Sequence, residues 1–277
     1  MENLKIRSLT SILLIPLIFF IIWDGGLLYL LLCVLVLTIG ALEFAKMYSS
    51  QPANQHSFVL LGICTALLLI TRYFFTAEGS MFFLVVSVFI FGIWGVVSLE
   101  RGNANAANGF AVMISGLVYF GWIGGYLISL RRIPDGQLWI ILCLLLIWTS
   151  DTGAFFVGSL MGKHRMLPLV SPRKTWEGYF GGIVTCLAIG LLLHRIIPNF
   201  NHMMTVQQML LLALAISCIG SIGDFVESMI KRTFKAKDSS NLIPGHGGFF
   251  DRLDTVLWVI PIGYFFYSIL NSGLIQL

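Results

Sequence analysis

A short polar segment near the C-terminus combines residue types that could hold phosphates and a metal ion. KDSSNLIPGHGGFFDRLD, residues 237–254, contains three aspartates, and its His246 lies between glycines. Glycines permit positive φ angles and leave backbone N–H groups accessible, as turns that bind phosphate require. Asp251 and Asp254 are three residues apart and would face the same way on a helix. Their carboxylates would offer the hard oxygen ligands that Mg²⁺ prefers.

A second polar stretch, GSIGDFVESMIKR, lies at the end of an apolar run. Its polar residues recur at i, i+3, i+4 and i+7, a spacing that places on one helical face Asp224, Glu227, Ser228 and Lys231. Gly220 and Gly223 would let another backbone approach this face. A polar stripe is poorly suited to lipid, so we expect it to line a site or a contact between helices. With Asp251 and Asp254, Asp224 completes a candidate Mg²⁺ site.

The elements that position these residues are predicted to be membrane helices. Of the 277 residues, 57% are hydrophobic and 11% are charged, whereas a soluble domain carries about 25% charged residues. Runs of about 20 apolar residues recur, each long enough to cross roughly 30 Å of hydrocarbon as a helix. The sequence predicts an all-α polytopic membrane protein with about nine transmembrane helices, near residues 8–23, 27–45, 57–75, 80–99, 109–130, 137–157, 178–197, 207–230 and 254–275.

We expect residues 1–277 to form a single membrane domain. Residues 1–100 would be its N-terminal helical part, and residues 137–275 would carry the catalytic helices and the cytoplasmic loops. Of the 17 lysines and arginines, 13 fall on the side of the N-terminus and 4 on the other side, which predicts a cytoplasmic N-terminus. The long loops at 158–177 and 231–253 would then face the cytoplasm.

Acidic side chains at membrane depth are costly and therefore candidates for function. Asp151 and Asp224 each lie about 9–10 Å inside the end of a predicted helix at 1.5 Å per residue. A polar cavity open to the cytoplasm would explain both acids, and a structural pairing with a neighbouring cation is the alternative. The cations of the 158–177 loop could bind phosphates or contact anionic lipid, and the charges alone favour neither.

Two segments together resemble a known enzyme family. SMIKRTFKAKDSSNLIPGHGGFFDRLD, residues 228–254, resembles the signature of the phosphatidate cytidylyltransferases, the CDP-diacylglycerol synthases. The segments SDTGAFFVGSLMGKHRM and VSPRKTWEG, within residues 150–178, resemble a further hallmark of that family. The resemblance is strongest over residues 148–254 and weak over the first 100 residues.

The resemblance implies an activity and its partners. CTP and phosphatidate would give CDP-diacylglycerol and pyrophosphate in phospholipid biosynthesis, with Mg²⁺ required and a second cation left open. We expect membrane lipid but no nucleic acid as a partner, a homodimer, and a place in the inner (plasma) membrane with the active site facing the cytoplasm.

The resemblance also implies roles for individual residues. Asp224 and Asp251 would be metal ligands, with Asp254 as a third acid beside them. We expect catalytic roles for these three aspartates and for Lys231, Arg252 and His246. The expected substrate-binding residues are Asp151, Ser171, Lys174, Thr175, Glu177, Glu227, Ser228, Arg232, Lys237, Asp238, Gly247 and Gly248.

The chemistry suits this set because a phosphomonoester has a second pKa of about 6 and is largely ionised near pH 7. The nucleophile then needs alignment and charge neutralisation more than a general base. A cytidylyltransferase or CTP-dependent kinase acting on an isoprenoid lipid is the alternative within the enzyme class. A cation-coupled secondary transporter would use similar acids, but near the midplane and with inverted repeats.

Overall fold

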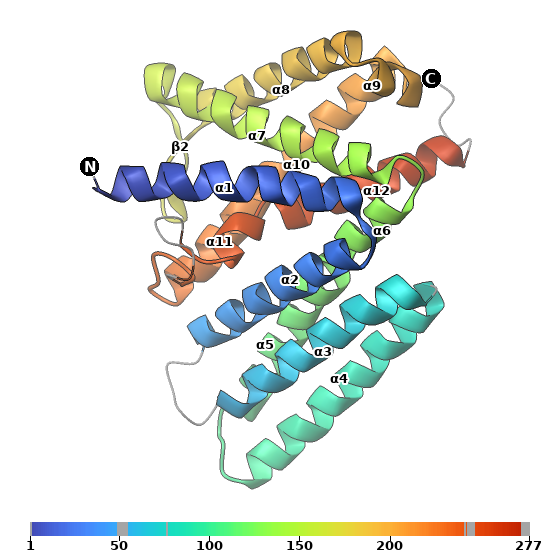
Figure 1. The fold of residues 1–277 in the computed structure, drawn as a ribbon. Coiled ribbons are helices and arrows are strands. Elements are labelled where there is room, and N and C mark those ends of the chain that lie inside the picture. The colour runs from blue at the N-terminus through green and yellow to red at the C-terminus, as the bar shows by residue number, and fades with distance from the viewer. Residues whose placement is uncertain (1, 49–54, 76, 241, 243–246, 273–277) are drawn as a thin grey trace. The chain divides into compact units, whose positions relative to one another are not determined.

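Helices dominate the structure, a computed structural model that describes residues 2–48, 55–75, 77–240, 242 and 247–272 (Figure 1). Seven helices in the described part are long and apolar enough to cross a membrane, namely Gly26–Tyr48, Gly79–Glu100, Ala106–Arg132, Gly136–Met161, Trp176–Ile196, Val206–Thr233 and Phe250–Asn271. Two shorter apolar helices cover Ile12–Asp24 and Phe58–Phe74. The predicted all-α polytopic membrane class is confirmed. The count of nine spans and the side of the N-terminus stay predictions.

The chain divides into two compact units. The first comprises Met1–Arg132 and Thr233–Leu253, and the second comprises Ile133–Arg232 and Asp254–Leu277. The polar segment identified in the sequence is therefore shared between them, with residues 237–253 in the first unit and Asp254 in the second.

The first unit contains α1 (Glu2–Asp24), α2 (Gly26–Tyr48), α3 (Gln55–Phe74), α4 (Ala77–Glu100), α5 (Ala106–Gly116), the π-helical η2 (Leu117–Ile123), α6 (Tyr126–Arg132) and the short α11 (Phe250–Leu253). Helix α2 packs against α3, η2 and α11. Rings of Phe44, Phe120 and Phe250 meet there, with centroids 5.3–6.1 Å apart. Gly40 makes room for this cluster, because a Cβ atom on it would lie 2.8 Å from the Phe120 ring.

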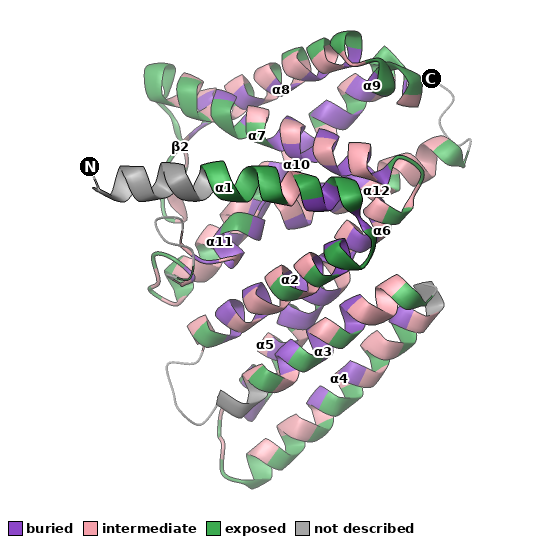
Figure 2. Ribbon diagram, viewed as in Figure 1, coloured by how far each residue is buried: buried purple, intermediate pink, exposed green. Residues whose placement is uncertain are grey.

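The outer helices of the first unit present apolar side chains to their surroundings. Helix α4 is largely exposed (Figure 2), and its exposed residues include Phe82, Phe89 and Ile93. Large apolar patches of this kind mark contact surfaces for proteins or membranes, which agrees with the membrane class.

The second unit contains α7 (Gly136–Met161), β1 (Arg165–Leu167), β2 (Ser171–Thr175), α8 (Trp176–Ile196), α9 (Pro198–Met203), α10 (Val206–Thr233) and α12 (Val256–Asn271). The last residue of α10, Thr233, is assigned to the first unit. Glycines bring α7 and α8 together, since a Cβ atom on Gly182 would lie 2.8 Å from the Ser150 carbonyl oxygen. The 158–177 segment, expected as a loop, contains an antiparallel hairpin in which Arg165 pairs with Thr175 and Leu167 with Ser171. Alternation of apolar and polar residues is detected over four to eight residues, so the three-residue β1 is too short to show it, and β2, SPRKT, does not alternate.

Candidate functional site

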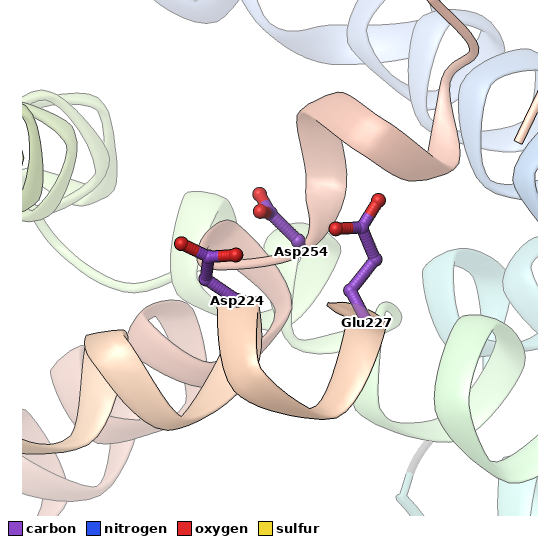
Figure 3. A group of neighbouring side chains, drawn as sticks. All are labelled: Asp224, Glu227 and Asp254. Carbon is purple, nitrogen blue, oxygen red and sulfur yellow. The ribbon is translucent and has the colours of Figure 1, made fainter. Parts of the chain in front are cut away.

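Three carboxylates of the second unit converge at one point. Asp224, Glu227 and Asp254 each offer an oxygen, and these oxygens lie within 4.8 Å of one another. Asp224 and Glu227 stand one turn apart on α10, and Asp254 precedes α12 (Figure 3). Glu227 is buried, with 2% of its surface exposed, while the other two are half-buried. We refer to these residues as the acidic cluster.

Close packing of α10 against the start of α12 forms the acidic cluster. A Cβ atom on Gly223 would collide with the backbone carbonyl oxygen of Asp254 and would lie 2.6 Å from the Trp258 ring. One turn earlier, a Cβ atom on Gly220 would lie 3.2 Å from Val259. The close approach expected at these glycines from the sequence is therefore present, and it brings Asp254 to the polar face of α10.

Two lysines offset the negative charge of the acidic cluster. Lys174, on β2, forms an ion pair with Asp224, and its ammonium lies 4.5 Å from the centre of the Phe225 ring. Lys231, one turn beyond Glu227 on α10, pairs with it at 2.8 Å. Carboxylates this close disfavour each other's ionised form, and neighbouring cations reverse that effect. The arrangement can therefore hold several negative charges at once.

Further polar groups surround the acidic cluster. Ser228 donates a hydrogen bond to Asp224 Oδ1 at 3.2 Å. The backbone N–H of Thr255 donates to Asp254 Oδ1 at 2.8 Å. Asp151, on α7, lies within electrostatic range of Lys174 and Asp224. Asp151 on α7, Lys174 on β2 and Asp224 on α10 were all predicted to be site residues, and their charges therefore interact with one another.

Hydrogen bonds at the base of the β1–β2 hairpin, where its two chain ends meet, stabilise the segment that carries Lys174. Glu177 accepts hydrogen bonds from the backbone N–H groups of Lys163 at 3.1 Å and of His164 at 3.2 Å. The His164 ring nitrogen Nδ1 lies 2.6 Å from the same carboxylate. Thr175 Oγ1 accepts from the Gly178 N–H at 3.2 Å and caps α8. The contacts of Glu177 and Thr175, which were predicted to bind substrate, thus lie at the two chain ends of the hairpin, and their substrate roles stay predictions.

Asp251 lies in the first unit, where Ser239 and Gly248 hold its carboxylate. Its Oδ2 atom accepts hydrogen bonds from Ser239 N at 2.9 Å, Ser239 Oγ at 2.9 Å and Gly248 N at 2.8 Å. Gly247 has a φ angle of 81°, and this left-handed conformation favours glycine. The predicted role of Asp251 as a metal ligand stays a prediction, as does its expected pairing with Asp224.

The other predicted residues are dispersed. Exposed positions are occupied by Arg232, Lys237, Asp238 and Arg252. Ser171 is half-buried in β2. His246 lies outside the described residues. Their catalytic and binding roles stay predictions.

The sequence reasoning missed Glu43. This residue lies on α2 in the first unit, is 4% exposed, and accepts hydrogen bonds from Ser239, Ser240 and the backbone at 249–250. The sequence did contain a sign of its importance. Glu43 is an acidic residue inside the predicted apolar helix 27–45, and Asp151 was selected as a candidate for the same reason.

The fold and the site together define a class: a polytopic α-helical membrane protein that gathers carboxylates and lysines at the end of a helix. Comparison with known proteins narrows this class. Residues 5–270 match the cytidylyltransferase family, and the chain belongs to that family. The resemblance of residues 228–254 and 150–178 is thereby confirmed, and the protein is an enzyme of the nucleotidyltransferase type.

Bacterial relatives match the chain over nearly its whole length. It is 33% identical to the phosphatidate cytidylyltransferase of Staphylococcus saprophyticus, over 99% of this chain and 100% of that one. It is 32% identical to the phosphatidate cytidylyltransferase of Staphylococcus epidermidis, over 94% and 97%. The protein of that name from Bacillus subtilis is 30% identical, over 98% and 100%.

Proposed function

We propose that the protein transfers CMP from CTP to phosphatidate, which gives CDP-diacylglycerol and pyrophosphate. The acidic cluster with its two lysines is the observation that supports this proposal, since it combines a place for a divalent ion with cations for phosphate. Relatives that share almost the full length of the chain carry the name of this activity. The reaction would take place at the cytoplasmic side of the inner membrane, where most loop cations are predicted to lie.

The acidic cluster fits Mg²⁺. Three oxygen donors within 4.8 Å of one another are the kind of ligand that Mg²⁺ takes from a protein alongside substrate phosphates. Asp224, Glu227 and Asp254 would hold the ion, which would neutralise charge on the triphosphate of CTP. Glu227, expected from the sequence to bind substrate, joins Asp224 and Asp254 in this set. Asp251, the remaining ligand expected from the sequence, lies in the first unit, and its role as a ligand stays a prediction.

The residues of the second unit then have complementary tasks. An oxygen of the phosphatidate phosphate attacks the α-phosphorus of CTP, the bond from that phosphorus to the bridging oxygen breaks, and pyrophosphate leaves. Lys174 and Lys231 stand beside the carboxylates and would bind phosphate oxygens as negative charge gathers there. Glu177 keeps the hairpin closed at its base and so keeps Lys174 near Asp224.

A direct assay tests the proposal. Purified protein in detergent receives radiolabelled CTP and phosphatidate, with and without Mg²⁺, and the lipid extract is separated by chromatography. We expect label in CDP-diacylglycerol only when Mg²⁺ and phosphatidate are both present. A parallel reaction with an isoprenoid phosphate or isoprenoid alcohol distinguishes the lipid. Labelling of the isoprenoid alone, or no labelling in any reaction, would overturn the proposal.

A further inference from the structure

We propose that Glu43 is a positioning residue that holds the turn around Asp251 in its active conformation. The inference deepens the proposed function and rests on it, because the turn carries Asp251, a predicted ligand of the reaction's metal. The residues concerned all belong to the first unit. We call Ser239, Ser240 and residues 247–251 the anchored turn.

Glu43 binds the anchored turn with both of its carboxylate oxygens. Oε1 accepts from Ser240 Oγ at 2.5 Å and from the Phe249 N–H at 3.2 Å. Oε2 accepts from Ser239 Oγ at 2.9 Å and from the Phe250 N–H at 2.9 Å. Each oxygen therefore lies within hydrogen-bond distance of one hydroxyl and one backbone N–H, and the Ser239 hydroxyl is shared with Asp251. These contacts join α2 to a segment about 200 residues later in the chain.

The anchored turn passes this constraint to Asp251. Ser239 Oγ lies 2.9 Å from Glu43 Oε2 and 2.9 Å from Asp251 Oδ2. Its single proton can be donated to either carboxylate, so this hydroxyl links the two. The N–H groups of Ser239 and Gly248 hold the same Asp251 oxygen. A Cβ atom on Gly248 would lie 2.7 Å from Glu43 Cδ. A displacement of Glu43 would therefore release Ser239, the residue whose hydroxyl and backbone N–H hold the Asp251 carboxylate.

Only a carboxylate of this length fits the donors that surround Glu43. Backbone N–H groups always donate, and here one faces each oxygen of the side chain. A glutamine would present its NH₂ group to one of them in either orientation, which sets two donors against each other. The serine hydroxyls can rotate to accept, whereas the N–H groups of Phe249 and Phe250 cannot. Aspartate keeps the charge, but it is one methylene shorter.

A purely structural role would make Glu43 a buried acid that only stabilises the fold. The two roles differ in their readouts. A structural acid affects the unfolding temperature, while a positioning acid also affects how the active site responds to Mg²⁺. Replacement of a residue that orients a metal ligand typically costs about 10–100-fold in metal affinity or activity.

The test compares Glu43→Gln with Glu100→Gln, a matched change at an exposed glutamate of the same unit. Turnover of CTP is measured against Mg²⁺ concentration in detergent, together with the unfolding temperature. We expect Glu43→Gln to lose about 10–100-fold in turnover and to need more Mg²⁺ for half-maximal activity, while Glu100→Gln matches the wild type. A folded Glu43→Gln protein with wild-type turnover and Mg²⁺ dependence would overturn the inference.

Two further measurements cover the remaining outcomes. If Glu43→Gln does not fold, Ser240→Ala removes one donor from Glu43 Oε1 and keeps the buried charge. We expect this variant to lose less turnover than Glu43→Gln and to need more Mg²⁺ than the wild type. Unchanged kinetics would contradict the inference. Hydrogen exchange over residues 237–253 requires no activity. Faster exchange in Ser240→Ala or Glu43→Gln, but not in Glu100→Gln, supports the anchor even if the wild-type protein fails to make CDP-diacylglycerol. Unchanged exchange in the folded variants would contradict it.

Discussion

The two units each bury carboxylates, but they compensate the negative charge in different ways. In the second unit, Asp224 and Glu227 pair with the side chains of Lys174 and Lys231. In the first unit, Glu43 accepts hydrogen bonds from serine hydroxyls and backbone N–H groups. Lysine side chains are long and can exchange one anionic partner for another, whereas backbone N–H groups are fixed by the fold. Lysine pairing therefore suits a site that accepts ions and phosphates, and backbone donors suit an anchor.

The largest expected effect comes from changing the acidic cluster itself. Asp224→Asn keeps the shape of the side chain but removes one charged ligand, so we expect turnover to fall by about 10²–10³-fold. The protein should stay folded, because Asp224 is half-buried and its amide variant retains an oxygen acceptor. Asp135→Asn is the control, since Asp135 is exposed in the same unit and its φ angle of 54° suits asparagine. Full activity of Asp224→Asn would mean that the lysine-paired carboxylates of the second unit are not the metal site, which would contradict the functional difference between the two units.

Removal of Lys174 is the next largest effect. Lys174→Met keeps an unbranched side chain that is one atom shorter, and it removes the positive charge beside Asp224. We expect turnover to fall by about 10- to 100-fold, on the basis of what a hydrogen bond to a charged group contributes. Steady-state kinetics with varied CTP measures the change, and Lys163→Met, at an exposed lysine before the same hairpin, is the control. A gain of activity would mean that Lys174 competes with the metal for Asp224 instead of binding phosphate.

The packing of α10 against α12 offers a third test. Gly223→Ala forces a methyl group against the backbone of Asp254, and overpacking of this kind costs about 1–3 kcal/mol. We expect a lower unfolding temperature and weaker Mg²⁺ activation. Gly95→Ala is the control, because the nearest atom to its Cβ lies at 3.6 Å. A variant at Gly223 with unchanged stability and Mg²⁺ activation would contradict the close approach described above.

The smallest expected effect is at the base of the hairpin. Glu177→Gln retains one oxygen that can accept from the N–H groups of Lys163 and His164, so the hairpin should remain closed. We expect a few-fold loss of activity with an unchanged unfolding temperature, measured in the same CTP assay. A loss as large as that of Asp224→Asn would show that Glu177 touches substrate and does more than hold the hairpin.

Parts of this site could be predicted from the sequence because their geometry is local. Asp224 and Glu227 lie one turn apart on a helix, so helical periodicity alone places them on one face. Gly223 indicated that another backbone approaches this face, although the approaching residue could not be derived from periodicity. The membrane class followed from apolar run length, which depends on composition and not on packing.

Other parts depend on contacts between distant residues. Glu43 meets its partners about 200 residues later in the chain, and no spacing rule relates them. The hairpin at 165–175 is held by Glu177 and by pairing between very short strands, so its pattern was indistinguishable from a loop. The pairing of Lys174 with Asp224 follows from the hairpin and was beyond reach for the same reason.

The most direct test of the central claim is a measurement of divalent ion binding by the acidic cluster. Electron paramagnetic resonance with Mn²⁺ in place of Mg²⁺ counts bound ions in the detergent-solubilised protein. We expect bound Mn²⁺ in the wild type and in Asp135→Asn, and weakened or absent binding in both Asp224→Asn and Asp254→Asn. Equal Mn²⁺ binding in all four proteins would show that these carboxylates do not hold the metal, and the account would be wrong.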